Sequence, residues 1–249
     1  MKNILFILTV LSASIACSPS FADDADNKDA EKIHLKGYKK HLNGNLKAAE
    51  KMYTEALLMN ATSCEVYFKR GVVRYESGKF QEAISDFEKV IAMNPSHAEA
   101  YNYKGIALLE TGDTASALKD HDRAIELNPN YGDAYYQKGY IHMHMGEYEQ
   151  AIKEYDKAIY LVPGQGYMHL NRSYAYYLNK KYHKAMHDIN IAQSIMSDNP
   201  YVYKIKALTE IAMGNNHSAC ESMEEADALG YAEAYGNDLI ELSKKYCKK

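Results

Sequence analysis

The chain has 249 residues, of which 47% are hydrophobic and 25% are charged, a balance typical of a folded protein rather than a disordered one. The formal net charge of −4 provides no general attraction to phosphate backbones, so we expect no nucleic-acid partner. Tyrosine is the unusual component, with 23 Tyr beside 5 Phe and no Trp.

The first 22 residues have the pattern of a secretory signal. Lys2 provides a positive start, residues 3–16 are mostly apolar, and the small–x–small sequence at 20–22 precedes two acidic residues. We therefore expect a signal peptide over 1–22, cleavage after Ala22, and export to a bacterial periplasm as a soluble protein.

A second interpretation of this segment stays open. Residues 13–17, Ala-Ser-Ile-Ala-Cys, resemble a bacterial lipoprotein signal, in which Cys17 is lipidated and becomes the new N-terminus. The chain would then be anchored to the envelope. We expect contact with a membrane only in that case, because no later apolar stretch approaches the length of a membrane span.

A 34-residue period organises most of the remaining chain. Residues 23–29 carry four acidic positions and are expected to form a short flexible linker. The period then recurs six times without insertion or deletion, over 30–63, 64–97, 98–131, 132–165, 166–199 and 200–233.

Each repeat is expected to form a helix, a short turn and a second helix; in the third repeat these helices cover 100–111 and 114–127. Small residues recur at positions 8, 20 and 27, where two helices could approach closely. Position 15 is Gly in five repeats and Lys180 in the fifth, and a glycine there would end the first helix. Three repeats have proline at position 32, which would close the second helix: Pro95, Pro129 and Pro163.

These columns resemble the tetratricopeptide repeat, a 34-residue pattern of aromatic, Gly, Tyr, Ala, Phe and Pro positions. The early aromatic column is Tyr67, Tyr101, Tyr135 and Tyr203, and the late one includes Tyr53, Phe87 and Tyr155. The resemblance covers residues 30–233 and implies an all-α, right-handed superhelical solenoid of six helix-turn-helix units. We expect residues 234–249 to form one capping helix with a polar outer face, shielding the last apolar surface.

Two cysteines near the C-terminus are candidates for a disulfide bond. Cys220 and Cys247 lie almost symmetrically about the junction at 233–234, so antiparallel helices joined there would bring them together. An exported location permits the bond. The alternative is a pair of buried free thiols.

No pattern of residues indicates catalysis, so we expect no enzymatic activity and no cofactor. The chain has neither a phosphate-binding Gly-rich loop nor a GxSxG turn. His142 and His144 alternate with methionines, but adjacent residues of a helix point about 100° apart and do not converge on one ion. His183 and His187 share a helix face without an evident third ligand, so we expect no metal site.

The resemblance implies that a protein or peptide partner lies along the concave face, which is lined by the first helices. The corresponding positions here are mainly tyrosines, which suit interfaces because each has a large apolar face and one hydroxyl. The predicted partner-binding residues are Tyr38, Phe68, Tyr75, Asn102, Tyr103, Tyr136, Gln137, Tyr140, Tyr167, Asn171, Tyr174, Tyr177 and Tyr201. The Lys and Asn residues with which some tetratricopeptide adaptors grip a C-terminal carboxylate are absent from the matching positions His34, Tyr38, Lys69, Glu99 and Tyr103.

Three hypotheses follow for the function. We favour an interaction scaffold or adaptor that binds a protein or peptide segment in this groove. The alternatives are a metal-handling protein that uses the His and Met residues, and a self-assembling structural module.

Position 7 is basic in all six repeats, which indicates a structural task such as reaching carbonyls or carboxylates of an adjacent helix: Lys36, Arg70, Lys104, Lys138, Arg172 and Lys206.

Overall fold

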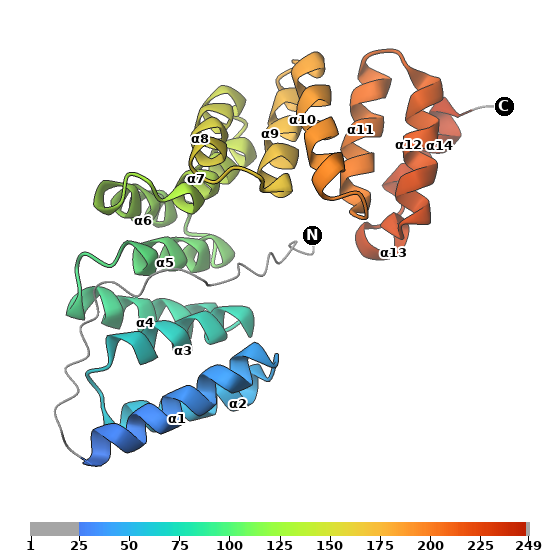
Figure 1. Cartoon of the computed structure of the whole chain (residues 1–249). Coiled ribbons are helices and arrows are strands. Elements are labelled where there is room, and N and C mark those ends of the chain that lie inside the picture. The colour runs from blue at the N-terminus through green and yellow to red at the C-terminus, as the bar shows by residue number, and fades with distance from the viewer. Residues whose placement is uncertain (1–24, 248–249) are drawn as a thin grey trace. The chain divides into compact units, whose positions relative to one another are not determined.

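The computed structural model of this chain describes residues 25–247, which form fourteen α-helices and no strand (Figure 1). The all-α class expected from the sequence is therefore confirmed. The helices cluster into two units, with the division between Ala134 and Tyr135, and each unit is considered by itself below. The predicted signal peptide and Cys17 lie outside the described residues.

The N-terminal unit is built from three helix pairs. Its helices are α1 (Ala25–Leu42), α2 (Leu46–Met59), α3 (Cys64–Glu76), α4 (Phe80–Met93), α5 (Ala98–Glu110) and α6 (Thr114–Leu127). Within each pair the two helices pack together, and α2 and α4 also contact the first helix of the next pair. Figure 1 shows α1 to α6 following one another in this stacked order.

The C-terminal unit continues the same plan. It contains most of α7 (Gly132–His144), followed by α8 (Tyr148–Leu161), α9 (Gly166–Leu178), α10 (Tyr182–Ile195), α11 (Pro200–Ala212), α12 (Asn216–Ala228), α13 (Tyr231–Tyr235) and α14 (Asp238–Tyr246). The first helices of the second to sixth repeats begin at residues 64, 98, 132, 166 and 200, which is the spacing of the sequence period.

Local sequence signals explain where the helices begin and end. The first helices of five repeats are followed by a glycine with positive φ, such as Gly112 at 86° and Gly146 at 79°, a conformation that suits glycine because it has no Cβ. Second helices begin after a capping residue in two cases: the side chains of Asn45 and Asp113 accept hydrogen bonds from the backbone N–H groups of Ala48 and Ser116.

The close approach within a pair depends on the small residue at position 8. A Cβ added to Gly139 would lie 2.7 Å from the ring of Tyr155, and one added to Gly71 would lie 2.7 Å from the ring of Phe87. The side chains of Tyr155 and Phe87 are fully buried. The second helix therefore places a ring directly against the backbone of the first helix.

The structure differs from two of the expected boundaries. Residues 25–29 belong to α1 rather than to a flexible linker. The C-terminal segment forms two helices instead of one, because Gly236, with a φ of 102°, ends α13 before α14 begins.

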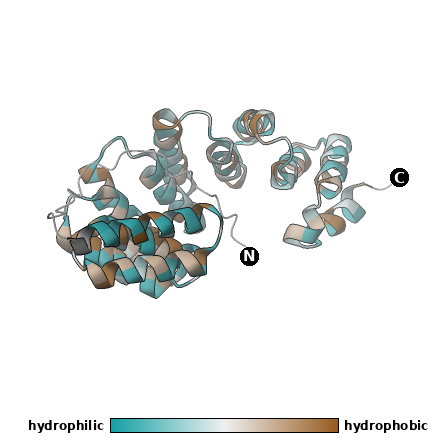
Figure 2. Ribbon diagram, turned by 60° about the horizontal axis from the view of Figure 1, so that its bottom comes forward, coloured by the Kyte–Doolittle hydropathy of each residue, from teal (hydrophilic) through white to brown (hydrophobic). Residues whose placement is uncertain are grey.

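The helices mix hydrophobic and hydrophilic residues along their length (Figure 2). Among the described residues, none of the helices combines the length and the hydrophobicity needed to cross a bilayer.

Candidate peptide-binding surface

Five half-buried tyrosines on the first helices of the C-terminal unit form a continuous aromatic surface, here called the tyrosine row: Tyr136, Tyr140, Tyr174, Tyr177 and Tyr201. Tyr136, Tyr140 and Tyr174 pack against one hydrophobic cluster. Tyr174 also packs against the next cluster, together with Tyr177 and Tyr201. Tyr174 and Tyr177 lie nearly parallel, with ring centroids 6.1 Å apart. Tyr174 therefore links α7 with α11.

Two other predicted residues of this unit support the row from inside. The amide nitrogen of Asn171 donates a hydrogen bond of 2.6 Å to the hydroxyl of Tyr136. Tyr167 is only 7% exposed, and its ring meets that of Tyr136 edge to face at 5.0 Å. Tyr167 is too buried to present its ring to a partner, so its role is to hold Tyr136. Gln137 is half-buried beside Tyr136 on α7.

Two predicted residues of the N-terminal unit are internal. Phe68 is 6% exposed and contacts the rings of Phe87, His97 and Tyr103. Asn102 is 1% exposed, with its side-chain oxygen 3.0 Å from His121 Nδ1. Both residues belong to the core, because the second helix of the pair covers them.

Three predicted tyrosines of the N-terminal unit remain half-buried: Tyr38, Tyr75 and Tyr103. The ammonium of Lys69 lies 5.7 Å from the centre of the Tyr38 ring, and the Tyr75 ring lies 5.6 Å from that of Phe80. Burial raises the pKa of Tyr103 well above its ordinary value, so its hydroxyl stays protonated at neutral pH.

The tyrosine row ends in a cluster that sequence reasoning missed. Tyr201 lies 5.7 Å from Tyr235, which stacks on Tyr231 at 5.1 Å. The ammonium of Lys204 lies over the rings of Tyr201 and Tyr231 and pairs with Asp238 at 2.7 Å. Burial raises the pKa of Tyr201 to about 12. One signal was available: Tyr231 occupies position 32 of its repeat, where three other repeats have proline.

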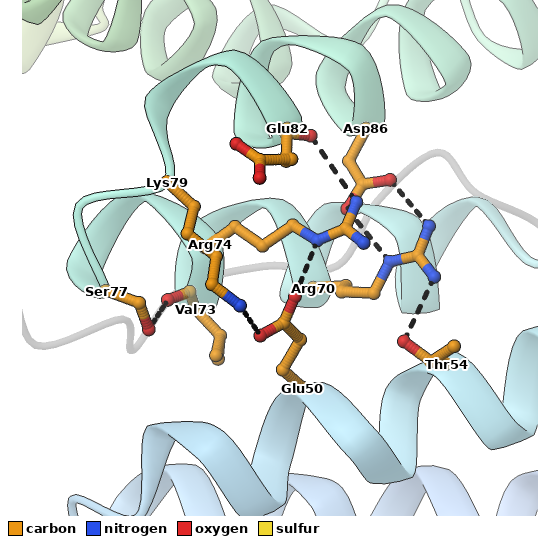
Figure 3. A network of polar contacts seen from close by, with 9 residues as sticks. All are labelled: Glu50, Thr54, Arg70, Val73, Arg74, Ser77, Lys79, Glu82 and Asp86. Atoms are coloured by element: carbon orange, nitrogen blue, oxygen red, sulfur yellow. Dashed lines mark hydrogen bonds and ion pairs between the residues drawn. The ribbon is translucent and has the colours of Figure 1, made fainter.

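In the second to fifth repeats the basic residue at position 7 holds the two helices of a pair together. Arg70 donates to both carboxylate oxygens of Asp86, at 2.9 and 2.7 Å, and to the hydroxyl of Thr54 in the preceding repeat (Figure 3). Arg74 joins Asp86 to Glu50, which Lys79 also contacts (Figure 3). For the second to fifth repeats the structure confirms that this column reaches carboxylates of an adjacent helix.

The same contact recurs in the following repeats at a constant spacing of sixteen residues. Lys104 pairs with Asp120 at 3.2 Å, Lys138 with Glu154 at 3.3 Å, and Arg172 with Asp188 at 2.7 Å. In the sixth repeat the acid is replaced by Ser222, and Lys206 turns to Gln193 at 3.3 Å. These residues are engaged within the fold and are not a basic surface for a partner.

The histidines considered as metal ligands do not converge. His142 Nδ1 lies 2.6 Å from Glu147, the ring of His144 packs on Tyr140 at 4.3 Å, and His183 and His187 are exposed on α10. Within residues 25–247, no group of three His, Cys, Asp or Glu side chains is placed to hold a metal ion.

The C-terminal helix is attached through a disulfide bond. The sulfur atoms of Cys220 in α12 and Cys247 after α14 are bonded, with Cα atoms 5.6 Å apart. Leu239 of α14 is buried in the same hydrophobic cluster as Met223 of α12. The bond and this contact together keep α14 on the end of the last repeat.

Comparison with known proteins identifies the repeat. Two family models described as tetratricopeptide repeat match residues 68–132 and 132–165. No curated protein sequence matches the chain.

Among solved structures, MamA is 28% identical over 65% of this chain and 94% of its own, with a TM-score of 0.57. The pilF protein of Pseudomonas aeruginosa is 17% identical over 90% of this chain and all of its own, with a TM-score of 0.75. YrrB, described as a TPR protein with an unusual peptide-binding site, is 22% identical over 74% of this chain and 99% of its own, with a TM-score of 0.56. Together with the helix pairs and the 34-residue spacing, these matches show that the chain is a tetratricopeptide-repeat protein.

Proposed function

We propose that this chain is a non-enzymatic interaction scaffold or adaptor that binds a protein or peptide segment on its tyrosine row. The observation that carries the proposal is the row itself: five tyrosines from three successive first helices, all half-buried and continuous through Tyr174. Half-buried tyrosines can bury ring surface against a partner at a low cost in side-chain entropy, because their rings are already held by the fold.

The fold supports this use of the surface. In the first four pairs the second helix contributes a buried ring at position 24, such as Tyr155, whereas the row lies on the first helices α7, α9 and α11. YrrB, described as a TPR protein with an unusual peptide-binding site, supports the view that a protein of this fold can present such a site. An extended peptide with aromatic or aliphatic side chains fits the apolar rings, and the tyrosine hydroxyls can meet its backbone.

We further propose that the protein works in the bacterial periplasm or cell envelope. Support comes from the signal-like residues 1–22 and from the Cys220–Cys247 bond, which is typical of an oxidising compartment. The intact mass of the protein recovered from cells distinguishes cleavage after Ala22 from lipidation of Cys17.

The role of the tyrosine row is tested by capture of partners and then by direct measurement of binding. The mature protein, carrying an affinity tag, is incubated with envelope extract, partners are identified by mass spectrometry, and the affinity for each purified partner is measured. Tyr140→Ala combined with Tyr174→Ala should weaken binding at least about 10-fold, because each lost ring removes roughly 1 kcal/mol or more of contact.

A matched control is Tyr160→Ala, since this tyrosine of α8 is 79% exposed and lies outside the row. It should bind as the unchanged protein does. Circular dichroism must show that the double variant retains its helices. Equal affinity of the double variant and the unchanged protein would refute the proposal.

A further inference from the structure

A shallow cavity of about 350 Å³ lies at the turn between α9 and α10 in the C-terminal unit. Its lining combines basic side chains with one aromatic ring and one methionine: Lys180, Lys181, Tyr182, His183, Lys184 and Met213. Here it is called the basic cavity. Neither the repeat pattern nor the tyrosine row accounts for it.

Most of the positive charge around the basic cavity is not neutralised by the protein. Lys181 pairs with Glu149 at 3.0 Å. Lys184 lies over the Tyr176 ring at 5.8 Å, a contact that leaves its charge in place. Within residues 25–247, no carboxylate lies within ion-pair distance of Lys180, His183 or Lys184. The cavity is therefore locally positive in a chain whose net charge is −4.

The turn that forms the cavity departs from the other turns of the repeat. Five repeats place glycine at position 15, with φ between 71° and 86°. The fifth repeat places Lys180 there with a φ of 58°, the one non-glycine residue with positive φ in the described chain. A side chain in this conformation costs roughly 1 kcal/mol or more, so the folded protein accepts strain at the position that carries this charge.

The basic cavity is continuous with the tyrosine row. The ring of Tyr182, which lines the cavity, lies 6.0 Å from the ring of Tyr177. Tyr177 stacks in turn with Tyr174. A peptide chain that crosses Tyr174 and Tyr177 would next meet the ring of Tyr182 and with it the cavity.

We propose that the basic cavity binds the Asp or Glu side chains of the peptide whose apolar residues lie on the tyrosine row. The partner is thus a segment with an apolar or aromatic stretch next to an acidic one. Carboxylates complement the ammonium groups of Lys180 and Lys184, while the apolar rings exclude charged residues from the other part of the segment. This inference rests on the proposed function, because it assigns a partner chemistry to the same surface.

The test uses two fluorescein-labelled synthetic peptides and the full mature protein. The acidic probe joins a Leu-Phe-Leu stretch to four Asp residues, and the neutral probe has Asn in place of Asp. Each probe is made in two versions, one with the Leu-Phe-Leu stretch at the N-terminal end and one with it at the C-terminal end. At low ionic strength the acidic probe should bind at least about 3- to 10-fold more tightly than the neutral one, and added salt should remove the difference.

Two substitutions isolate the cavity. Lys180→Gly restores the residue found at this position in five repeats, so it removes a charge without threatening the fold. Combined with Lys184→Gln it should abolish the preference for the acidic probe and leave the affinity for the neutral probe unchanged. Lys89→Gln, on the exposed surface of α4 in the other unit, is the control for loss of a surface charge away from the cavity and should preserve the preference.

The outcomes separate the two proposals. Tyr140→Ala with Tyr174→Ala should weaken both probes, whereas the lysine variant should weaken only the acidic one. Equal affinity for the two probes, or an equal loss of affinity for the acidic probe in Lys89→Gln, would overturn the proposal for the basic cavity. The proposal for the tyrosine row would be unaffected. Displacement of the acidic probe by inorganic phosphate, beyond that caused by chloride at equal ionic strength, would indicate a phosphate site. That result would also overturn the proposal that the basic cavity binds Asp or Glu side chains.

Discussion

Arg172 in α9 holds Asp188 in α10 through two hydrogen bonds of 2.7 Å, from Nε to Oδ2 and from Nη2 to Oδ1. The carboxylate of Asp188 is almost completely buried, and burial alone would raise its pKa. The hydrogen bonds from Arg172 and His169 outweigh that effect and hold the pKa of Asp188 below its ordinary value. The carboxylate of Asp188 is therefore ionised and buried, and its pair with the half-buried Arg172 joins the two helices of one repeat.

Removing the arginine should be costly because the carboxylate stays buried without its partner. We expect Arg172→Met to lower the free energy of unfolding by about 3–5 kcal/mol. Arg123→Met is the control, since the Arg123–Glu126 pair lies on the exposed surface of one helix, and no measurable change is expected. Urea unfolding followed by circular dichroism measures both. Similar losses of unfolding free energy in the two variants would show that breaking the Arg172–Asp188 pair costs no more than breaking an exposed pair.

The glycine at position 8 should tolerate no Cβ where a ring faces it. Gly139→Ala would place a Cβ 2.7 Å from the ring of Tyr155, and we expect a loss of about 1–3 kcal/mol in the free energy of unfolding. In the fifth repeat the facing residue is Ile189 and position 8 is Ser173, so a smaller partner accompanies a larger residue.

A double-mutant cycle checks this explanation. Tyr155→Ile alone removes packing, but in combination with Gly139→Ala it removes the clash as well. The double variant should therefore lose less stability than the two single variants added together. Additive losses would mean that the ring and the glycine do not restrict each other.

The sequence period predicted the helix pairs and their spacing well, because glycine and proline at fixed positions end helices by local backbone chemistry; in the third repeat the first helix begins at Ala98, two residues before the expected start. It could not predict which columns face each other. The acid at position 23, exemplified by Asp86 and Asp188, follows the basic residue at position 7 by sixteen residues in the second to fifth repeats. That relationship depends on tertiary packing of two helices and has no local backbone signature.

The candidate site was predicted less well than the fold, for a physical reason. Position within a repeat indicates which side of a helix a residue occupies, but the depth of its burial depends on the size of its neighbours. Asn102 and Tyr167 thus occupy repeat positions typical of a binding surface, yet both lie in the core. The basic cavity depends on Lys180, which the alignment of repeats showed only as a missing glycine.

The disulfide bond should fix the end of the C-terminal unit. Its loop spans 27 residues, for which the chain-entropy relation gives a stabilisation of about 3–4 kcal/mol. Replacing both cysteines, as Cys220→Ser with Cys247→Ser, should increase amide hydrogen exchange in α14 and leave exchange in α3 and α4 unchanged. Mass-spectrometric exchange of the two forms measures this. Unaltered protection of α14 would show that Leu239 and the Lys204–Asp238 pair hold the helix without the bond.

The N-terminal unit should lose stability on mild acidification because of His34. Burial lowers the pKa of this side chain below its ordinary value of 6.5; Glu65 and Glu31 raise it, and Lys69 lowers it further. Its Nε2 atom is buried without a hydrogen-bond partner, since Glu65 is 3.9 Å away. A proton added there would be poorly accommodated between α1, α2 and α3.

The direction in which stability changes with pH follows from proton linkage. Because the folded pKa is depressed, the unfolded chain takes up the proton first as the pH falls below 6.5, so the folded state loses stability. By pH 5.5 the loss from this residue is at most about 1.4 kcal/mol. The melting temperature of the unchanged protein should therefore fall between pH 7.5 and 5.5, and it should fall less in His34→Gln. His217→Gln is the control, because that side chain is 94% exposed. An NMR titration in which His34 protonates at pH 6.5 or above would contradict this account.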